Sequence, residues 1–368
     1  MTAAGITPDN LVPRLRQKAL ARGFPAGWAQ TGGEFAEWQA AAGAIARRHI
    51  LPDPALRERP CGWRTDALED RGSHFALQGA ILLEDDGEWP ALMLRPKGKG
   101  PHPAALLLHD HGSEFRIGKE KCIRPMRQGL PLASEWVTRF FDGVWLGEVL
   151  AAQGFVVLAV DALGWGGRQG NGYASQQALA CNLMQIGTSL AGVIAAEDMA
   201  VAEFLADLPE VDDDRICAIG FSLGGFRAWQ VAALSPHVRA AVSAGWMASL
   251  PGLAVPGNNQ LRGQSAFSTT HPGLHAYLDL PDLAGLAAPK PIWFEVGKQD
   301  HLFPEAAVKA GFENLAAIWA AADAGAQLRL ERPAGGHCFG LDRQGQALGW
   351  LRATIGLTDS ITTGSGIC

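Results

Sequence analysis

The chain has 368 residues, a formal net charge of −6 and a hydrophobic content of 48%. This balance excludes a disordered chain and supplies enough apolar side chains for a large core. Because the charge is acidic and no basic stripe occurs, nucleic acid is not expected as a partner.

The first residues carry neither a basic segment nor an apolar one behind it, so no secretory signal is predicted. No run of 18 apolar residues occurs, and we therefore expect no membrane span. The six cysteines are scattered and form no C-x-x-C pair, which argues against a zinc knuckle or a thioredoxin-type site. These observations together predict a cytoplasmic protein with reduced cysteines.

Residues 1–60 are predicted to form an N-terminal extension of two helices and a proline-rich linker. The second helix, residues 34–48, ends in two arginines that suit the negative end of a helix dipole. From His74 onward the sequence becomes strand-like. Residues 75–83 and 91–94 flank an acidic turn that ends in glycine, which predicts a β-hairpin.

After the hairpin, short apolar runs alternate with helical stretches. The predicted strands are residues 104–108, 155–160, 216–219, 240–244, 291–296 and 328–330, and the predicted helices are residues 135–152, 176–208, 222–234, 304–324 and 344–355. Continuous apolar strands between helices are typical of a parallel sheet that is buried on both faces. We therefore expect an α/β fold in residues 61–357, with a mostly parallel central sheet of about eight strands and helices on both faces. Residues 358–368 are predicted to be a flexible tail.

The most informative motif is G-x-S-x-G at residues 220–224. An apolar strand precedes Ser222 and a helical pattern follows it. This strand–turn–helix context exposes a serine hydroxyl on a strained turn, and the flanking glycines avoid clashes with neighbouring backbone. The five-residue pattern also occurs by chance, but in this context it predicts Ser222 as a nucleophile.

A serine nucleophile needs a base, and the base needs an orienting carboxylate. Among the ten histidines, His337 lies in a Gly-Gly loop directly after the last predicted strand, where the base of such an arrangement is expected. Asp300 begins the loop after strand 291–296 and is the predicted carboxylate, although an aspartate here could also cap the next helix. Glu295 is a weaker candidate because it lies inside the strand.

The oxygen that becomes negative during acyl transfer needs N–H donors. The backbone N–H of Leu223 directly follows the nucleophile, and the loop after strand 104–108 supplies a second donor. We predict that this donor is His111, with Gly112 close behind. His109 and His111 could instead share a face and bind a metal, but no further ligand cluster accompanies them, so no metal is predicted.

Taken together, the motifs resemble the α/β-hydrolase superfamily, in which the catalytic residues follow the order Ser, Asp, His. Over about residues 75–355, the chain is similar to the dienelactone-hydrolase-like and acetyl-xylan-esterase-like serine hydrolases. The resemblance rests on residues 106–112 and 160–168, the serine turn, and the loops of Asp300 and His337. It implies hydrolysis of a carboxylic ester. Dienelactone hydrolases use a cysteine where this chain has a serine, which argues against a dienelactone as the substrate.

Two glycine-rich segments do not match cofactor-binding motifs. Residues 112–120 miss the spacing of a phosphate loop, and residues 164–169 miss the dinucleotide fingerprint, so no cofactor is expected. Trp165 and Trp246 each follow a predicted strand end and are candidates for a substrate pocket, although tryptophans serve equally often in the core.

The expected reaction is two-step acyl transfer through Ser222, with a small-molecule ester as the partner. Lys119, Lys121 and Arg124 could attract an acidic substrate, but a solvated surface explains them better. The alternative function is an oligopeptidase or amidase on the same scaffold, although the N-terminal segment is too short for an added propeller. A non-catalytic binding protein is disfavoured by the intact Ser, Asp and His. Whether identical chains associate is left open.

Overall fold

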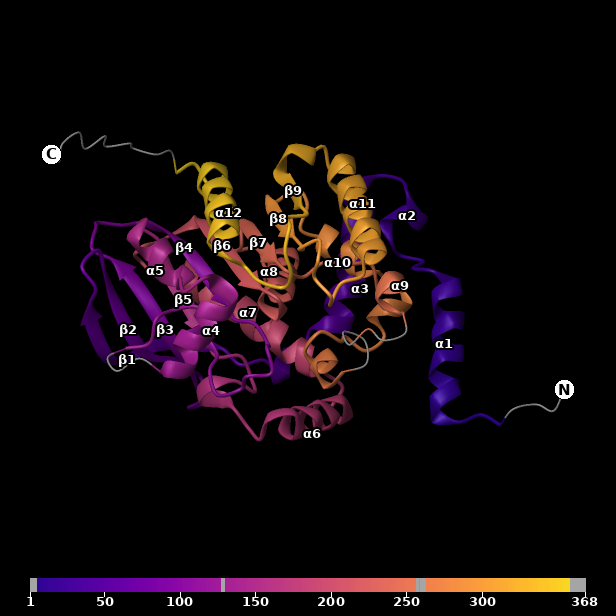
Figure 1. Cartoon of the computed structure of the whole chain (residues 1–368), viewed down its shortest axis with the longest axis horizontal. Helices are drawn as coiled ribbons and strands as arrows, with labels where there is room; N and C mark the ends of the chain where they lie inside the picture. Colours follow the sequence, from indigo (N-terminus) through magenta and orange to yellow (C-terminus); the bar gives the residue numbers. More distant parts are fainter. Residues whose placement is uncertain (1–4, 127–129, 256–257, 259–262, 358–368) are drawn as a thin grey trace.

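The structure is a computed structural model and describes residues 5–126, 130–255, 258 and 263–357. The predicted flexible tail, residues 358–368, lies outside the described residues. A twisted sheet runs through the molecule, and helix α1 (Pro8–Arg22) lies at the side opposite to strand β1 (Figure 1).

The sheet has nine strands in the order β1-β2-β3-β5-β4-β6-β7-β8-β9. Their bounds are Pro60–Asp70 (β1), His74–Leu83 (β2), Glu88–Pro96 (β3), His102–Leu108 (β4), Val156–Val160 (β5), Val211–Phe221 (β6), Ala240–Ala244 (β7), Ile292–Glu295 (β8) and Leu328–Glu331 (β9). Strands β1, β2, β3 and β5 pair antiparallel, whereas β5, β4, β6, β7, β8 and β9 pair parallel. The α/β class is therefore confirmed, and the sheet is mixed.

The expected count of about eight strands was one too low, because no strand was predicted before residue 75 and β1 precedes it. Every residue of β1 is half-buried or exposed. An edge strand that buries neither face shows no apolar alternation from which it could be predicted.

The parallel strands separate two hydrophobic cores, because successive side chains of a strand point to opposite faces of the sheet. In β5, Val156 and Leu158 enter the core beneath helices α3, α7, α8, α10 and α11, whereas Val157 and Ala159 enter the core beneath α4, α5 and α12. Both faces of β5 are thus covered, which explains why every residue of this strand is apolar and buried.

The remaining helices are α2 (Trp28–Thr31), α3 (Phe35–Ile50), α4 (Pro131–Phe141), α5 (Leu146–Ala152), α6 (Gly172–Gln185), α7 (Leu190–Ala206), α8 (Leu223–Leu234), α9 (Leu250–Leu253), α10 (Leu280–Gly285), α11 (Glu305–Ala321) and α12 (Leu341–Thr354). The helix predicted for residues 135–152 is two helices, because the chain turns at Asp142 and Gly143 with φ of 53° and 78°. Gly187, with φ of 84°, similarly separates α6 from α7.

The N-terminal extension packs on the α/β core through α3. Its buried residues Trp38, Ala42, Ala46 and Ile50 recur every fourth position, which places them on one face of the helix. Arg47 donates a hydrogen bond of 2.7 Å to the carbonyl of Leu234 at the end of α8. Within the described residues, no single helix has the length and apolar character of a membrane span, and α6 and α7 meet those criteria only as a pair bent by 87°.

Candidate active site

Ser222 lies on the turn between β6 and α8, with φ of 56° and ψ of −123°. A non-glycine residue rarely adopts a positive φ, so this backbone is strained unless its surroundings hold it. The N–H of Ser222 donates to the carbonyl of Ala244 at 2.8 Å, and its own carbonyl accepts from Phe226 at 3.1 Å. These bonds tie the turn to β7 on one side and to the first turn of α8 on the other.

The turn closes tightly because Gly220 has no side chain. A Cβ atom at this position would stand 2.1 Å from the carbonyl oxygen of Gly224. The glycine spacing of the motif is therefore a steric requirement of the backbone path that presents the hydroxyl of Ser222.

Ser222, His337 and Asp300 form a hydrogen-bonded chain. The Nε2 atom of His337 lies 2.8 Å from the Oγ atom of Ser222, and its Nδ1 atom lies 2.6 Å from the Oδ2 atom of Asp300. The carboxylate is buried, with 1% of its side chain exposed, whereas 13% of the His337 side chain remains exposed. The structure thus brings together three residues that are far apart in the sequence, in the arrangement of a nucleophile, a base and an orienting group.

Further contacts hold Asp300 and His337 in place. The Oδ1 atom of Asp300 accepts from the N–H of Leu302 at 3.0 Å, which leaves Oδ2 for the histidine. The guanidinium of Arg343 in α12 donates to the carbonyl of Cys338 at 2.7 Å and thereby fixes the residue next to His337. The imidazole also packs on the ring of Phe221, with centroids 4.7 Å apart. This packing limits the rotation of the imidazole.

The loop predicted to supply oxyanion donors lies beside this turn. Strands β4 and β6 are parallel neighbours, and Leu108 pairs with Gly220 in register. The loop that begins at His109 therefore leaves the sheet next to Ser222, at the carboxyl edge of both strands. Leu223 is the first residue of α8, so its N–H belongs to the free donors of a helix N-terminus.

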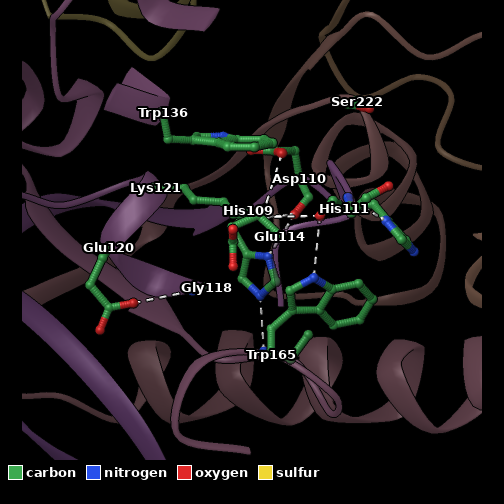
Figure 2. Close-up of polar contacts among 12 residues, drawn as sticks. His109, Asp110, His111, Glu114, Gly118, Glu120, Lys121, Trp136, Trp165 and Ser222 are labelled. Carbon is green, nitrogen blue, oxygen red and sulfur yellow. Dashed lines mark hydrogen bonds and ion pairs between the residues drawn. The ribbon is translucent and has the colours of Figure 1, made fainter. Parts of the chain in front are cut away.

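Buried cations hold the carbonyl groups of this loop (Figure 2). Lys121 donates to the carbonyl oxygens of Asp110 at 2.9 Å and of His111 at 3.1 Å. Arg227, paired with Asp198, donates to the carbonyl of His109 at 3.3 Å. The carbonyl groups of three successive residues are thus each bonded to a buried cation.

His109 and His111 are held as neutral rings. Burial lowers the pKa of both imidazoles, in the case of His111 to about 4. The Nε2 atom of His109 accepts from the N–H of Ala162 at 3.1 Å, and its Nδ1 atom lies 3.0 Å from the carbonyl of Asp110. Because these bonds occupy both nitrogens of His109, the ring offers no free lone pair, and the geometry gives no support to the metal alternative.

The two tryptophans proposed for the substrate pocket lie in different surroundings. Trp165 is fully buried, donates to the carbonyl of His111 at 3.3 Å, and packs against Phe115. Its position is that of a support for the loop. Trp246 packs on Phe303, which stacks on His337.

Trp246 also lines a pocket of about 240 Å³ beneath helix α1. The pocket is lined by Arg16, Ala19, Leu20, Phe24, Trp246, Leu250, Leu253, Ala254, Thr269, Thr270, His275 and Leu280. The pocket is mostly apolar, and its lining includes Trp246 but neither Phe303 nor any residue of the triad.

The interpretation of Lys119 and Lys121 as surface residues was wrong. Their exposed fractions are 8% and 1%, and Lys119 forms an ion pair of 2.7 Å with buried Asp161. The sequence offered only a weak indication of this burial, namely the apolar residues Ile117 and Ile123 on either side. Sequence reasoning also missed Arg227, which lies in the apolar stretch of α8.

Known structures share this architecture. A protein described as an acetyl xylan esterase from Bacteroides fragilis superposes with a TM-score of 0.66 at 16% identity, covering 90% of this chain and 83% of its own. A glucuronoyl esterase from Solibacter usitatus superposes with a TM-score of 0.59 at 14% identity, covering 89% and 93%. At these identities the likeness shows the fold, which is that of the α/β-hydrolases.

The sequence comparison then gives the family. The model of the dienelactone hydrolase family matches residues 142–346, more than half of the chain, and the protein belongs to this family. A protein named as a hydrolase, YtaP of Bacillus subtilis (strain 168), is 27% identical over 288 residues, which cover 78% of this chain and 89% of YtaP. The matched range includes Ser222, Asp300 and His337.

Proposed function

We propose that the protein is a serine esterase that cleaves a carboxylic ester through an acyl-enzyme on Ser222. The observation that carries the proposal is the chain of two hydrogen bonds from Ser222 through His337 to Asp300. Membership of a hydrolase family agrees with it.

In the first step, His337 takes the hydroxyl proton as the Oγ atom of Ser222 attacks the acyl carbon. The carbonyl oxygen of the ester becomes an oxyanion beside the N–H groups of His111 and Leu223. His337 then protonates the leaving alcohol, and the C–O bond breaks. In the second step, His337 removes a proton from water, which attacks the acyl carbon. The bond from that carbon to the Oγ atom of Ser222 breaks, His337 returns the proton to Oγ, and the acid leaves, while Asp300 keeps the other ring proton on Nδ1.

The pocket lined by Trp246 is the proposed site of the acyl group. It is mostly apolar, and Phe303 stands between Trp246 and His337, with ring centroids 5.6 Å and 6.4 Å away, so only an acyl chain that extends past Phe303 would enter it. An apolar group in such a pocket gains about 0.8 kcal/mol for each buried methylene, so acyl chains longer than acetyl should be preferred.

A fluorophosphonate probe tests the nucleophile. Native protein should become labelled at Ser222, as located by peptide mass spectrometry, and Ser222→Ala should remain unlabelled. Hydrolysis of p-nitrophenyl esters compared with aminoacyl anilides then separates an esterase from the peptidase or amidase alternative. Equal labelling of Ser222→Ala would show that another residue is the nucleophile.

A further inference from the structure

We propose that Lys121 is a positioning residue that orients the oxyanion-binding N–H groups of the loop after β4. The inference rests on the proposed function and adds a residue outside the triad. Lys121 is in a short 3-10 turn, Lys119–Lys121, and does not belong to the serine turn or to the loops of Asp300 and His337.

The ammonium group of Lys121 contacts this loop and the ring of Trp136 beside it. It is fully buried, and its Nζ atom contacts the carbonyls of Asp110 and His111, lies 3.6 Å from the carboxylate of Asp110, and stands 4.6 Å above the ring of Trp136. Burial lowers the pKa of this ammonium, opposed by the nearby carboxylate of Asp110. A buried cation is costly unless its partners satisfy it, so these contacts fix its position closely.

The two carbonyl contacts determine where the N–H groups point. In a trans peptide the C=O and N–H bonds of one unit point in opposite directions. Neither the peptide between Asp110 and His111 nor that between His111 and Gly112 is cis. With both carbonyls directed to Lys121, the N–H groups of His111 and Gly112 are directed away from it. Figure 2 shows Lys121 and Ser222 on opposite sides of this loop.

The neighbouring residues support the same orientation. Gly112 has φ of 51°, and a Cβ atom there would stand 2.0 Å from the ring of Trp136. Trp136 also donates to the carboxylate of Asp110 at 3.1 Å. The loop is thereby closed against Trp136, and its N–H donors need no rearrangement when charge develops on the substrate. Such pre-orientation of donors in a site away from water is a major source of transition-state stabilisation.

The structure offers Lys119 as a matched control. This second buried lysine of the same turn donates to the carboxylates of Asp161 and Glu120, at 2.7 Å and 2.8 Å. Methionine has an uncharged side chain of similar length, so replacing either lysine by methionine removes one buried positive charge. Only the replacement of Lys121 removes a cationic donor from the carbonyls of Asp110 and His111. Within the described part of the chain, these carbonyls then keep only His109 and Trp165 as their partners.

The test measures p-nitrophenyl ester hydrolysis, thermal unfolding, and inhibition by an aryl trifluoromethyl ketone, which forms an oxyanion on the nucleophile. Wild-type protein must first be labelled at Ser222 by the fluorophosphonate, and failure there would contradict the proposed function instead. For Lys121→Met we expect kcat to fall about ten- to a hundred-fold, less than the loss of a whole donor, with KM changed by less than about threefold. The inhibition constant should rise in proportion to the loss of kcat/KM.

For Lys119→Met we expect a lower unfolding midpoint, with kcat retained within about threefold. The proposal is overturned if Lys121→Met keeps its kcat, if only KM rises, if inhibitor affinity is retained while kcat falls, or if Lys119→Met loses as much kcat. Should Lys121→Met not fold, the double variant Asp110→Asn/Lys121→Met removes both charges of the pair and is measured in its place, with the same outcomes.

Discussion

A Cβ atom on Gly224 would stand 1.8 Å from the carbonyl oxygen of Leu108. The last residue of β4 and the first turn of α8 therefore meet backbone to backbone, directly beside Ser222. This approach brings the N–H of Leu223 and the loop that starts at His109 to the same place. The two proposed oxyanion donors come from different elements, and the absence of a side chain at residue 224 allows them to meet.

Gly224→Ala should consequently damage both the fold and the activity. The methyl group overlaps backbone that cannot rotate away, so we expect a loss of about 3 kcal/mol or more in the free energy of unfolding, and slower phosphonate labelling. Urea unfolding and labelling rates measure the two effects. In the control Gly345→Ala, the Cβ meets nothing within 4 Å on helix α12. This change should leave stability unchanged or raise it by about 0.5–1 kcal/mol. Normal stability of Gly224→Ala would contradict the described contact.

Asp300→Asn should lower kcat by roughly a thousand- to ten-thousand-fold while the protein stays folded. Asparagine keeps an oxygen for the N–H of Leu302, but it can no longer hold the protonated Nδ1 of His337 as a carboxylate does. Circular dichroism and p-nitrophenyl ester kinetics test this. Asp342→Asn, at an exposed position in the first turn of α12, is the control and should retain its activity. A loss below about tenfold would assign the orienting role elsewhere.

The sequence could predict those site residues that come soon after a strand. Ser222, Asp300 and His337 follow the carboxyl ends of β6, β8 and β9, and parallel neighbouring strands end at one edge of a sheet. No such rule applies to Lys121, whose partners are backbone carbonyls. Carbonyl groups are present at every residue and leave no signature in the sequence. Strand β1 was missed for a related reason, because its pairing is also made by backbone and its side chains bury neither face.

Glu295 should make stability depend on pH. Burial raises the pKa of this carboxyl from its ordinary value of 4.5 to about 7, opposed by Arg343 at 3.8 Å. Because the folded state binds this proton more tightly than the unfolded state, the contribution of Glu295 to stability is fully present below about pH 4.5. It is lost as the pH rises to about 7, a change on the order of 3 kcal/mol.

The variant Glu295→Gln should remove this dependence. Its free energy of unfolding should change less between pH 5 and 7 than that of wild type, and at pH 8 the variant should be more stable than wild type. Urea unfolding from pH 5 to pH 8 measures both effects. Glu313→Gln on α11 is the control, since 67% of its side chain is exposed, and its slope should match that of wild type. An unchanged slope in Glu295→Gln would show that this carboxyl titrates normally.

The pocket beneath α1 gives a prediction about acyl chain length. Ala254 is half-buried and lines the pocket, so Ala254→Trp should fill it without removing any residue of the triad. We expect kcat/KM for p-nitrophenyl hexanoate to fall about tenfold, since part of the roughly 3 kcal/mol available from four buried methylenes is lost. Hydrolysis of p-nitrophenyl acetate, whose acyl group needs little of the pocket, should change by less than about threefold. Ala321→Trp, at an exposed position on α11, is the control for the added indole and should leave kcat/KM for both esters unchanged. An equal loss for both esters would place the acyl group outside this pocket, because a filled acyl pocket must discriminate between chain lengths.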